Sequence, residues 1–242
     1  MASRIKQIDW FRHFFDGEPR IKNRFLLSRK TRYQQVIILQ TYSYGKCLIL
    51  DDELQSSEFD EKLYHQSLVH PVMHEINRNQ LNVLILGGGE GATLREVCKH
   101  PSVQTITMVD LDREVVEIAM DYLPTWHQNS FSDKRVQLIF QDAMEFIQNS
   151  NDFYDLIIMD LPSPASDNAI KPVYSLKSLQ SISLRLVPKG WIVTQAGPNH
   201  PFHPNPHQMI WNNFHPFFQS VKSHSIFIPS FNTPWTFIRG QK

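Results

Sequence analysis

Cysteine is scarce in this sequence. Cys47 and Cys98 are the only two among 242 residues, and neither stands in a Cys-x-x-Cys pair. Two isolated cysteines cannot form a disulfide framework, so we expect both to be small core residues of a cytoplasmic protein. An excess of one charge is lacking as well, because 24 acidic residues balance 24 Lys and Arg residues. This balance argues against a nucleic-acid partner or a polybasic membrane anchor.

Long apolar runs are also missing. No stretch approaches the roughly 20 residues that a transmembrane helix needs, and the polar start MASRIKQIDW does not read as a signal peptide. Hydrophobic residues make up 41% of the chain and charged residues 20%, which is ordinary for a globular protein. The length fits one large domain, or one domain with a small accessory piece.

Two patterns of secondary structure divide the chain. From about residue 24 to residue 52, β-branched and aromatic residues predict strands joined as hairpins. From about residue 81 onward, buried strands alternate with helices, which predicts a mostly parallel sheet with helices on both faces, the α/β class. We therefore predict a β-hairpin domain over residues 1–58 and an α/β domain over residues 59–242.

A helix is predicted between these two regions, over residues 60–76. Its apolar residues recur at helical spacing, and Pro71 lies inside the pattern. The residues expected to face inward are Leu63, Leu68, Val72 and Met73.

The segment LILGGGEGATLRE follows a predicted buried strand and opens a helix. Gly87, Gly89 and Gly91 allow a tight turn and let a ligand approach bare backbone. By itself the motif is weak evidence for a particular ligand, because it also fits the glycine-rich motif of dinucleotide-binding folds, in which Ala can replace the third Gly. Glu90 argues against a pyrophosphate, since its carboxylate would repel the phosphates that bind at such turns. A cationic sulfonium would be attracted, which favours S-adenosylmethionine chemistry over NAD.

Acidic residues follow the next two predicted strands. Asp110 ends the first of these, at the place where an acid can bind both ribose hydroxyls, while Asp112 is expected to cap the helix beginning at Arg113. Asp142 follows the other strand. It could accept a hydrogen bond from an adenine amine, or it could cap the short helix at residues 143–148, and the sequence leaves both readings open.

The segment YDLIIMDLPSP ends an apolar strand on Asp160 and then breaks at Pro162 and Pro164. Open α/β sheets bind ligands at the carboxyl ends of their strands, so a charged residue at such an end is placed to contact a ligand. The alternative is a turn acid that steadies the proline loop.

Together these motifs resemble the polyamine aminopropyltransferases, the family of spermidine and spermine synthases. The matching segments, in order, are YQ at Tyr33-Gln34, YGKCLILDDELQSSEFDEKLYHQSLVHP, GGGEGATLREVCKHPSV, VDLD, QDA, DLPSP and TQAG. Their order and spacing agree as well. GGGEG, the DL-x-x-P loop, TQAGP and the late PSF are most similar to thermospermine synthases.

The resemblance implies a Rossmann-like catalytic domain of the methyltransferase type behind the small β-hairpin domain. It implies an enzyme that transfers the aminopropyl group of decarboxylated S-adenosylmethionine to putrescine or spermidine, giving spermidine or (thermo)spermine and methylthioadenosine. Transfer would be a direct displacement without a metal or prosthetic group. The family is usually dimeric or tetrameric.

The resemblance also assigns roles to residues. Glu90 would face the aminopropyl ammonium and repel the carboxylate of ordinary S-adenosylmethionine. The positions that match donor-binding residues are Gln34, His65, Gly87, Gly89, Glu90, Gly91, Asp110, Asp142 and Ala143. Asp160 matches the catalytic acid–base residue. Tyr64 matches a tyrosine that lines the reaction centre; without the resemblance it would read as a half-buried aromatic of an amphipathic helix.

The acceptor side departs from the family pattern. Ser163 stands where the family loop commonly has a second Asp, and Phe231 stands where spermidine synthases tend to have Tyr. With Tyr64 they are the expected acceptor-binding residues. Compensating charge could come from Glu58, Asp60 and Glu61.

Three alternatives remain at this point. The first is a methyltransferase that uses ordinary S-adenosylmethionine, which Glu90 disfavours, and the second is a non-catalytic paralogue that binds polyamine or nucleoside, which Ser163 keeps open. An NAD-dependent oxidoreductase is a distant third. The histidine-rich stretch at residues 200–208 reads as a surface or lid loop rather than a metal site.

Overall fold

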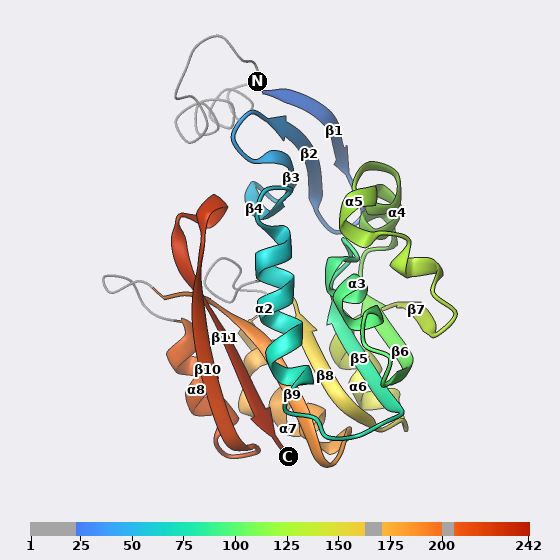
Figure 1. The fold of residues 1–242 in the computed structure, drawn as a ribbon, viewed down its shortest axis with the longest axis vertical. Coiled ribbons are helices and arrows are strands. Elements are labelled where there is room, and N and C mark those ends of the chain that lie inside the picture. Colours follow the sequence, from blue (N-terminus) through green and yellow to red (C-terminus); the bar gives the residue numbers. More distant parts are fainter. Residues whose placement is uncertain (1–22, 163–170, 200–205) are drawn as a thin grey trace. The chain divides into compact units, whose positions relative to one another are not determined.

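The structure is a computed structural model that describes residues 23–162, 171–199 and 206–242 (Figure 1). Two compact units make up the chain, residues 1–61 and residues 62–242. Most of the histidine-rich stretch at residues 200–208 lies outside the described residues. Within the described residues, no helix is long and apolar enough to cross a membrane.

The first unit contains a four-stranded antiparallel sheet in the order β1-β2-β3-β4. The strands are β1 (Arg24–Lys30), β2 (Gln35–Thr41), β3 (Gly45–Leu50) and β4 (Glu53–Ser57). Ile37, Leu39 and Ile49 form its apolar centre around Cys47, which is fully buried. Burial raises the pKa of the Cys47 thiol to about 12, so this cysteine is the core residue that the sequence predicted.

The second unit is built on a seven-stranded sheet in the order β10-β11-β9-β8-β5-β6-β7. Strands β5 to β9 run parallel to one another, whereas β11 pairs antiparallel with β9 and β10 antiparallel with β11 at one edge. The strands are β5 (Leu81–Gly87), β6 (Val103–Asp110), β7 (Val136–Phe140), β8 (Tyr154–Asp160), β9 (Leu186–Pro198), β10 (Gln219–Ile228) and β11 (Thr233–Gln241). The mostly parallel α/β sheet predicted from the sequence is confirmed.

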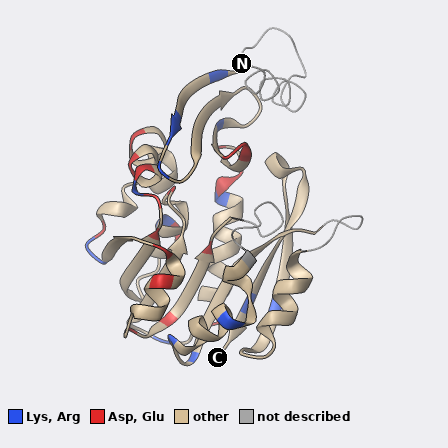
Figure 2. Cartoon of the chain, turned by 180° about the vertical axis from the view of Figure 1, so that it is seen from behind, with Lys and Arg blue, Asp and Glu red and all other residues tan. Residues whose placement is uncertain are grey.

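Helices cover both faces of this sheet because its central strands are apolar on both sides. Side chains alternate along β5: Val83 and Ile85 belong to one buried cluster, and Leu84 and Leu86 to another. The helices of the second unit are α2 (Glu61–Met73, whose first residue lies in the first unit), α3 (Ala92–Cys98), α4 (Arg113–Tyr122), α5 (Pro124–His127), α6 (Ala143–Asn149), α7 (Leu176–Leu184) and α8 (Pro206–Phe214). Short 3-10 turns are η1 (Ser130–Ser132), η2 (Lys171–Tyr174) and η3 (Pro229–Phe231). Acidic and basic residues are interspersed along these elements (Figure 2).

Helix α2 differs in one respect from the sequence-based prediction. Leu68 and Val72 are fully buried, as expected, but Leu63 is 37% exposed. Tyr64 packs against the same cluster as Leu68 and Val72, and these three residues recur every four positions along one helix face. Leu63 is therefore turned about 100° away from that face.

Candidate active site

The carboxyl ends of three neighbouring parallel strands carry the residues that the sequence singled out. Gly87 ends β5, Asp110 ends β6 and Asp160 ends β8. Gly87 and Asp160 are direct partners across the two strands, and the Gly88 amide donates to the Asp160 carbonyl oxygen at 3.0 Å. Ligands of open α/β sheets bind at this edge.

The glycine-rich turn connects β5 to α3 and depends on its lack of side chains. Gly87 and Gly91 have φ angles of +83° and +79°, which only glycine adopts readily. A Cβ at Gly87 would collide with the carbonyl oxygen of Asp160, and one at Gly89 would lie 2.9 Å from Asp110 Oδ2. The backbone of the turn therefore lies directly against two of the three strand ends.

Two hydroxyl groups approach the Asp160 carboxylate. Thr93, in the first turn of α3, is fully buried and donates from Oγ1 to Asp160 Oδ2 at 2.6 Å. The Tyr64 hydroxyl lies close enough to Asp160 to interact with its charge. Burial and the charge of Asp160 raise the pKa of Tyr64 well above its ordinary value. Tyr64 is therefore a neutral donor beside a carboxylate.

Tyr64 is also the centre of an aromatic wall. Its ring meets Phe237 edge-on with centroids 5.2 Å apart, and it meets Phe231 edge-on at 6.2 Å. Trp235 lies 4.7 Å from Phe231 between ring centroids and 6.5 Å from Tyr64. We refer to Tyr64, Phe231, Trp235 and Phe237 as the aromatic wall. It joins the helix that carries Tyr64 to the antiparallel edge of the sheet.

Glu90 forms a buried pair with His65. Only 2% of the His65 side chain and 9% of the Glu90 side chain are exposed, and His65 Nε2 lies 2.7 Å from Glu90 Oε1. The pair connects α2 with the glycine-rich turn. The resemblance predicts that both residues contact one donor, and in the structure they contact each other.

Asp110 and Asp112 take different places, as the sequence predicted. Asp112 caps α4, accepting a hydrogen bond from the Glu114 amide at 3.1 Å. Asp110 Oδ1 accepts a hydrogen bond from the backbone amide of Asp112 at 2.9 Å. Burial, followed by the charges of Asp112 and Asp160, raises the pKa of Asp110 to about 6. A carboxylate held this way can accept two hydrogen bonds from a vicinal diol.

Asp142 is the N-cap of α6. Its Oδ1 accepts hydrogen bonds from the Met144 and Glu145 amides, both at 2.8 Å. The capping alternative is therefore realised. Both hydrogen bonds of the cap go to Oδ1, and neither goes to Oδ2. Ala143, the first residue of α6, packs at the edge of the buried cluster behind it.

The remaining predicted residues belong to the first unit or lie outside the described residues. Gln34 belongs to the first unit, where its backbone forms a tight turn with Thr31 between β1 and β2. Glu58 accepts from the Lys46 amide at 3.0 Å, and Asp60 accepts from the Ser57 hydroxyl at 2.7 Å, both within the first unit. Glu61 begins α2. Ser163 lies outside the described residues.

Sequence reasoning missed two residues of this region. Thr93 lies inside the glycine-rich segment without any motif of its own. Gln195, in the TQAG segment, donates to the Leu161 carbonyl oxygen at 2.9 Å and accepts from Trp235 Nε1 at 3.2 Å. Gln195 is 1% exposed, so it connects the residue after Asp160 with the aromatic wall. The only available signal was that TQAG matches the family.

Among the described residues, no group of three or more His, Cys, Asp and Glu side chains is arranged to hold a metal ion. The site thus consists of a glycine-rich turn, three acids at or beside strand ends and an aromatic wall.

The second unit is a Rossmann-like domain of the methyltransferase type that carries these groups at its strand ends, and this defines the class of protein. Comparison with known proteins gives the family. Residues 61–242 match the spermine/spermidine synthase domain, and residues 10–58 match the spermidine synthase tetramerisation domain. The chain therefore belongs to the spermine/spermidine synthase family, a class of aminopropyltransferases.

Curated relatives and solved structures agree with this assignment. A polyamine aminopropyltransferase of Pyrobaculum calidifontis is 44% identical over 88% of this chain and 74% of its own, and one of Pyrobaculum neutrophilum is 41% identical over 90% and 75%. A spermidine synthase crystallised with the transition-state analogue AdoDATO is 25% identical, with a TM-score of 0.84 over 90% of this chain and 74% of that chain. Spermidine synthase from Thermotoga maritima shares the fold, with a TM-score of 0.80 at 24% identity over 90% and 72%.

Proposed function

We propose that this protein transfers the aminopropyl group of decarboxylated S-adenosylmethionine to a primary amine of a polyamine, releasing methylthioadenosine and a proton. The observation that carries the proposal is the convergence of Tyr64 and Asp160 beside the glycine-rich turn. A carboxylate in contact with a neutral hydroxyl, at the ligand-binding edge of the sheet, is suited to receive a proton from an attacking amine.

The donor binds along the ends of β5, β6 and β7. Asp110 accepts hydrogen bonds from the ribose hydroxyls, and the bare backbone at Gly89 lets the ribose come close. Asp142 receives the adenine amine through Oδ2. Glu90, positioned by His65, faces the ammonium of the aminopropyl arm. Gly87, Gly91 and Ala143 shape the turn and the α6 end of this site.

The chemical step is a displacement at carbon. The amine lone pair attacks the carbon next to the sulfonium, the carbon–sulfur bond breaks, and its electron pair stays on the neutral thioether. An alkylamine with a pKa of about 10.4 is protonated at neutral pH, so a proton must leave the nitrogen for the lone pair to react. Asp160 accepts that proton, and Tyr64 orients the carboxylate. No covalent enzyme intermediate is required.

The acceptor is putrescine or spermidine. The aromatic wall offers ring faces and edges to methylene groups and to ammonium groups, whereas Phe231 provides no hydroxyl for a specific polar contact. We expect the longer amine to gain more from this wall because it carries more methylene groups. Ser163, which lies outside the described residues, stands in the sequence where the family loop commonly has an acid, so we expect a hydroxyl in place of a charge.

An assay with several amines in parallel tests the function. Purified protein is incubated with decarboxylated S-adenosylmethionine and putrescine, spermidine, spermine or agmatine, and methylthioadenosine and the product amine are quantified. We expect turnover with putrescine or spermidine and its loss in Asp160→Asn, with Asp121→Asn on α4 as a matched control that keeps activity. Donor binding without turnover on any amine would favour the non-catalytic alternative. Methyl transfer from ordinary S-adenosylmethionine would favour the methyltransferase.

We further propose that the chain assembles into a homodimer or homotetramer through its first unit. The match of residues 10–58 to a tetramerisation domain supports this. Light scattering on the full chain should give a mass of two or four times 28.3 kDa; a monomer at micromolar concentration contradicts the proposal. The cytoplasmic location expected from the sequence stays a prediction.

A further inference from the structure

We propose that Thr93 is a positioning residue for the aminopropyl transfer, because its hydroxyl holds one oxygen of the Asp160 carboxylate and leaves the other for the reacting amine. This inference rests on the proposed role of Asp160 as the proton acceptor.

The contact is short, buried and directional. Thr93 Oγ1 lies 2.6 Å from Asp160 Oδ2, and Thr93 has no exposed surface. A hydroxyl carries a single proton, so this proton is committed to Asp160. Hydroxyl-to-carboxylate hydrogen bonds of this length are among the strong ones. The bond therefore restrains the rotation of the carboxylate about its terminal torsion, which is otherwise broad.

The surroundings of the carboxylate leave a restricted set of approaches. Beside Oδ2, the α-carbon of Gly88 is so close that a Cβ built there would lie 3.2 Å from this oxygen. Thr93 and the glycine-rich turn thus occupy the Oδ2 side. The amine of the acceptor must reach the carboxylate from elsewhere, which includes the side of Tyr64 and the aromatic wall.

Thr93 also connects the two substrates. It lies in the first turn of α3, directly after the turn that contains Glu90 and Gly91. Asp160 lies on β8, 67 residues further along the chain. A displacement of the glycine-rich turn therefore changes both the proposed donor-binding site and the orientation of the Asp160 carboxylate.

Removal of the hydroxyl should affect chemistry rather than donor affinity. In Thr93→Val, which keeps the branched shape, we expect kcat to fall by about tenfold or more, since a hydrogen bond to a charged group is lost. The donor KM should stay within about twofold. Thr93→Ser, which keeps the hydroxyl, should restore kcat.

The outcomes separate the two proposals. Wild-type kcat in Thr93→Val, or a fall in kcat/KM that lies only in the donor KM, in an enzyme whose wild type turns over, would overturn the role of Thr93 alone. No turnover in the wild type would overturn the proposed function. If Thr93→Val does not fold, Thr93→Ala is compared with Thr93→Ser: equal kcat in these two variants would overturn the proposal, and a lower kcat in Thr93→Ala alone would support it.

Discussion

His65 Nε2 lies 2.7 Å from Glu90 Oε1, and less than a tenth of either side chain is exposed. The two residues come from α2 and from the glycine-rich turn, so this pair brings a buried negative charge next to the proposed path of the aminopropyl arm. Taking a carboxylate out of water is unfavourable unless a cation or a hydrogen-bond donor pairs with it. We therefore expect Glu90 to recognise the ammonium of the donor, which gives the first prediction.

Glu90→Gln should weaken selection of the donor. The substitution keeps size but removes the charge, so we expect kcat/KM for decarboxylated S-adenosylmethionine to fall by about tenfold or more, in line with the loss of a hydrogen bond to a charged group. Binding of ordinary S-adenosylmethionine should improve relative to it, since its carboxylate no longer meets a like charge. Calorimetric titration with both nucleosides measures the ratio. Glu117→Gln, on the exposed side of α4, should behave as wild type, and unchanged discrimination in Glu90→Gln would contradict the assignment.

Asp110 should make donor binding depend on pH. Its pKa is raised from 3.8 to about 6, first of all by burial. The folded chain therefore holds this proton more tightly than the unfolded chain. The associated stability is complete below pH 3.8 and is lost as the pH rises through about 6. Donor affinity should change in the opposite sense, rising as the pH increases through 6, because the ionised carboxylate accepts both ribose hydroxyls.

Asp110→Asn separates these two effects. At pH 7 its melting temperature should equal or exceed that of the wild type, while donor affinity drops at least about tenfold. Thermal melts and donor titrations at pH 5, 6 and 7 measure both. A variant that retains full donor affinity would show that Asp110 does not bind the ribose.

Tyr64→Phe should lower kcat without loss of stability. The hydroxyl that contacts Asp160 disappears while the ring stays in the aromatic wall, so we expect a decrease of about tenfold with an unchanged melting temperature. Because burial and the charge of Asp160 raise the pKa of Tyr64 well above its ordinary value, any alkaline decline in rate up to pH 10 should be the same in wild type and Tyr64→Phe. Tyr42→Phe, at a 74% exposed position, is the control. An alkaline limb that vanishes in Tyr64→Phe alone would refute the neutral-donor role.

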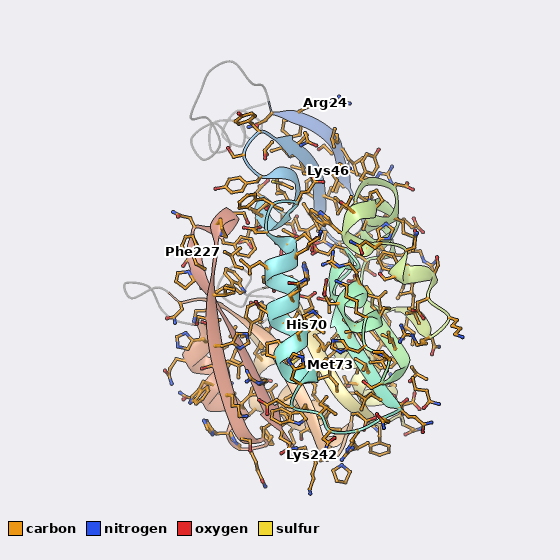
Figure 3. The ribbon with its side chains drawn as sticks, viewed as in Figure 1. Arg24, Lys46, His70, Met73, Phe227 and Lys242 are labelled. Atoms are coloured by element: carbon orange, nitrogen blue, oxygen red, sulfur yellow. The ribbon has the colours of Figure 1, made fainter. Side chains whose placement is uncertain are left out.

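The contact between α2 and the end of α3 should make stability sensitive to acid. His70 Nδ1 lies 3.0 Å from His100 Nε2, and His70 Nε2 lies 2.9 Å from Glu96 Oε2 (His70 is labelled in Figure 3). Burial, then the charges of His70 and His74, lowers the pKa of His100. Its contribution to stability is present above the ordinary value of 6.5 and is lost as the pH falls through the lower folded value.

His100→Asn should therefore flatten the dependence of the melting temperature on pH between 7 and 5. His215→Asn, at an exposed position of the second unit, should follow the wild-type curve. If the slope for His100→Asn equals that of the wild type, the acid sensitivity lies elsewhere.

Much of the fold follows from local patterns. Alternating strands and helices predicted the α/β class, and the structure shows the mostly parallel sheet with helices on both faces. Asp112 was expected to cap α4 and does so. These features depend on hydrogen bonds and periodicities spanning a few residues, so they can be read from neighbouring positions. The roles assigned to the site residues remain predictions, which the experiments above test.

The tertiary structure decided which side chains meet. Thr93 and Asp160 are 67 residues apart, and Gln195 contacts Trp235 across 40 residues. Neither contact has a sequence signature, because each depends on the order of strands in the sheet and on the direction in which a helix leaves it. Leu63, expected to be buried, is exposed for the same reason: Tyr64 takes the place that faces the core. The sequence by itself determined the helices and strands and the residue types at the strand ends. Packing determined which side chains contact one another, because segments far apart in the sequence meet only once the strands have assembled into the sheet.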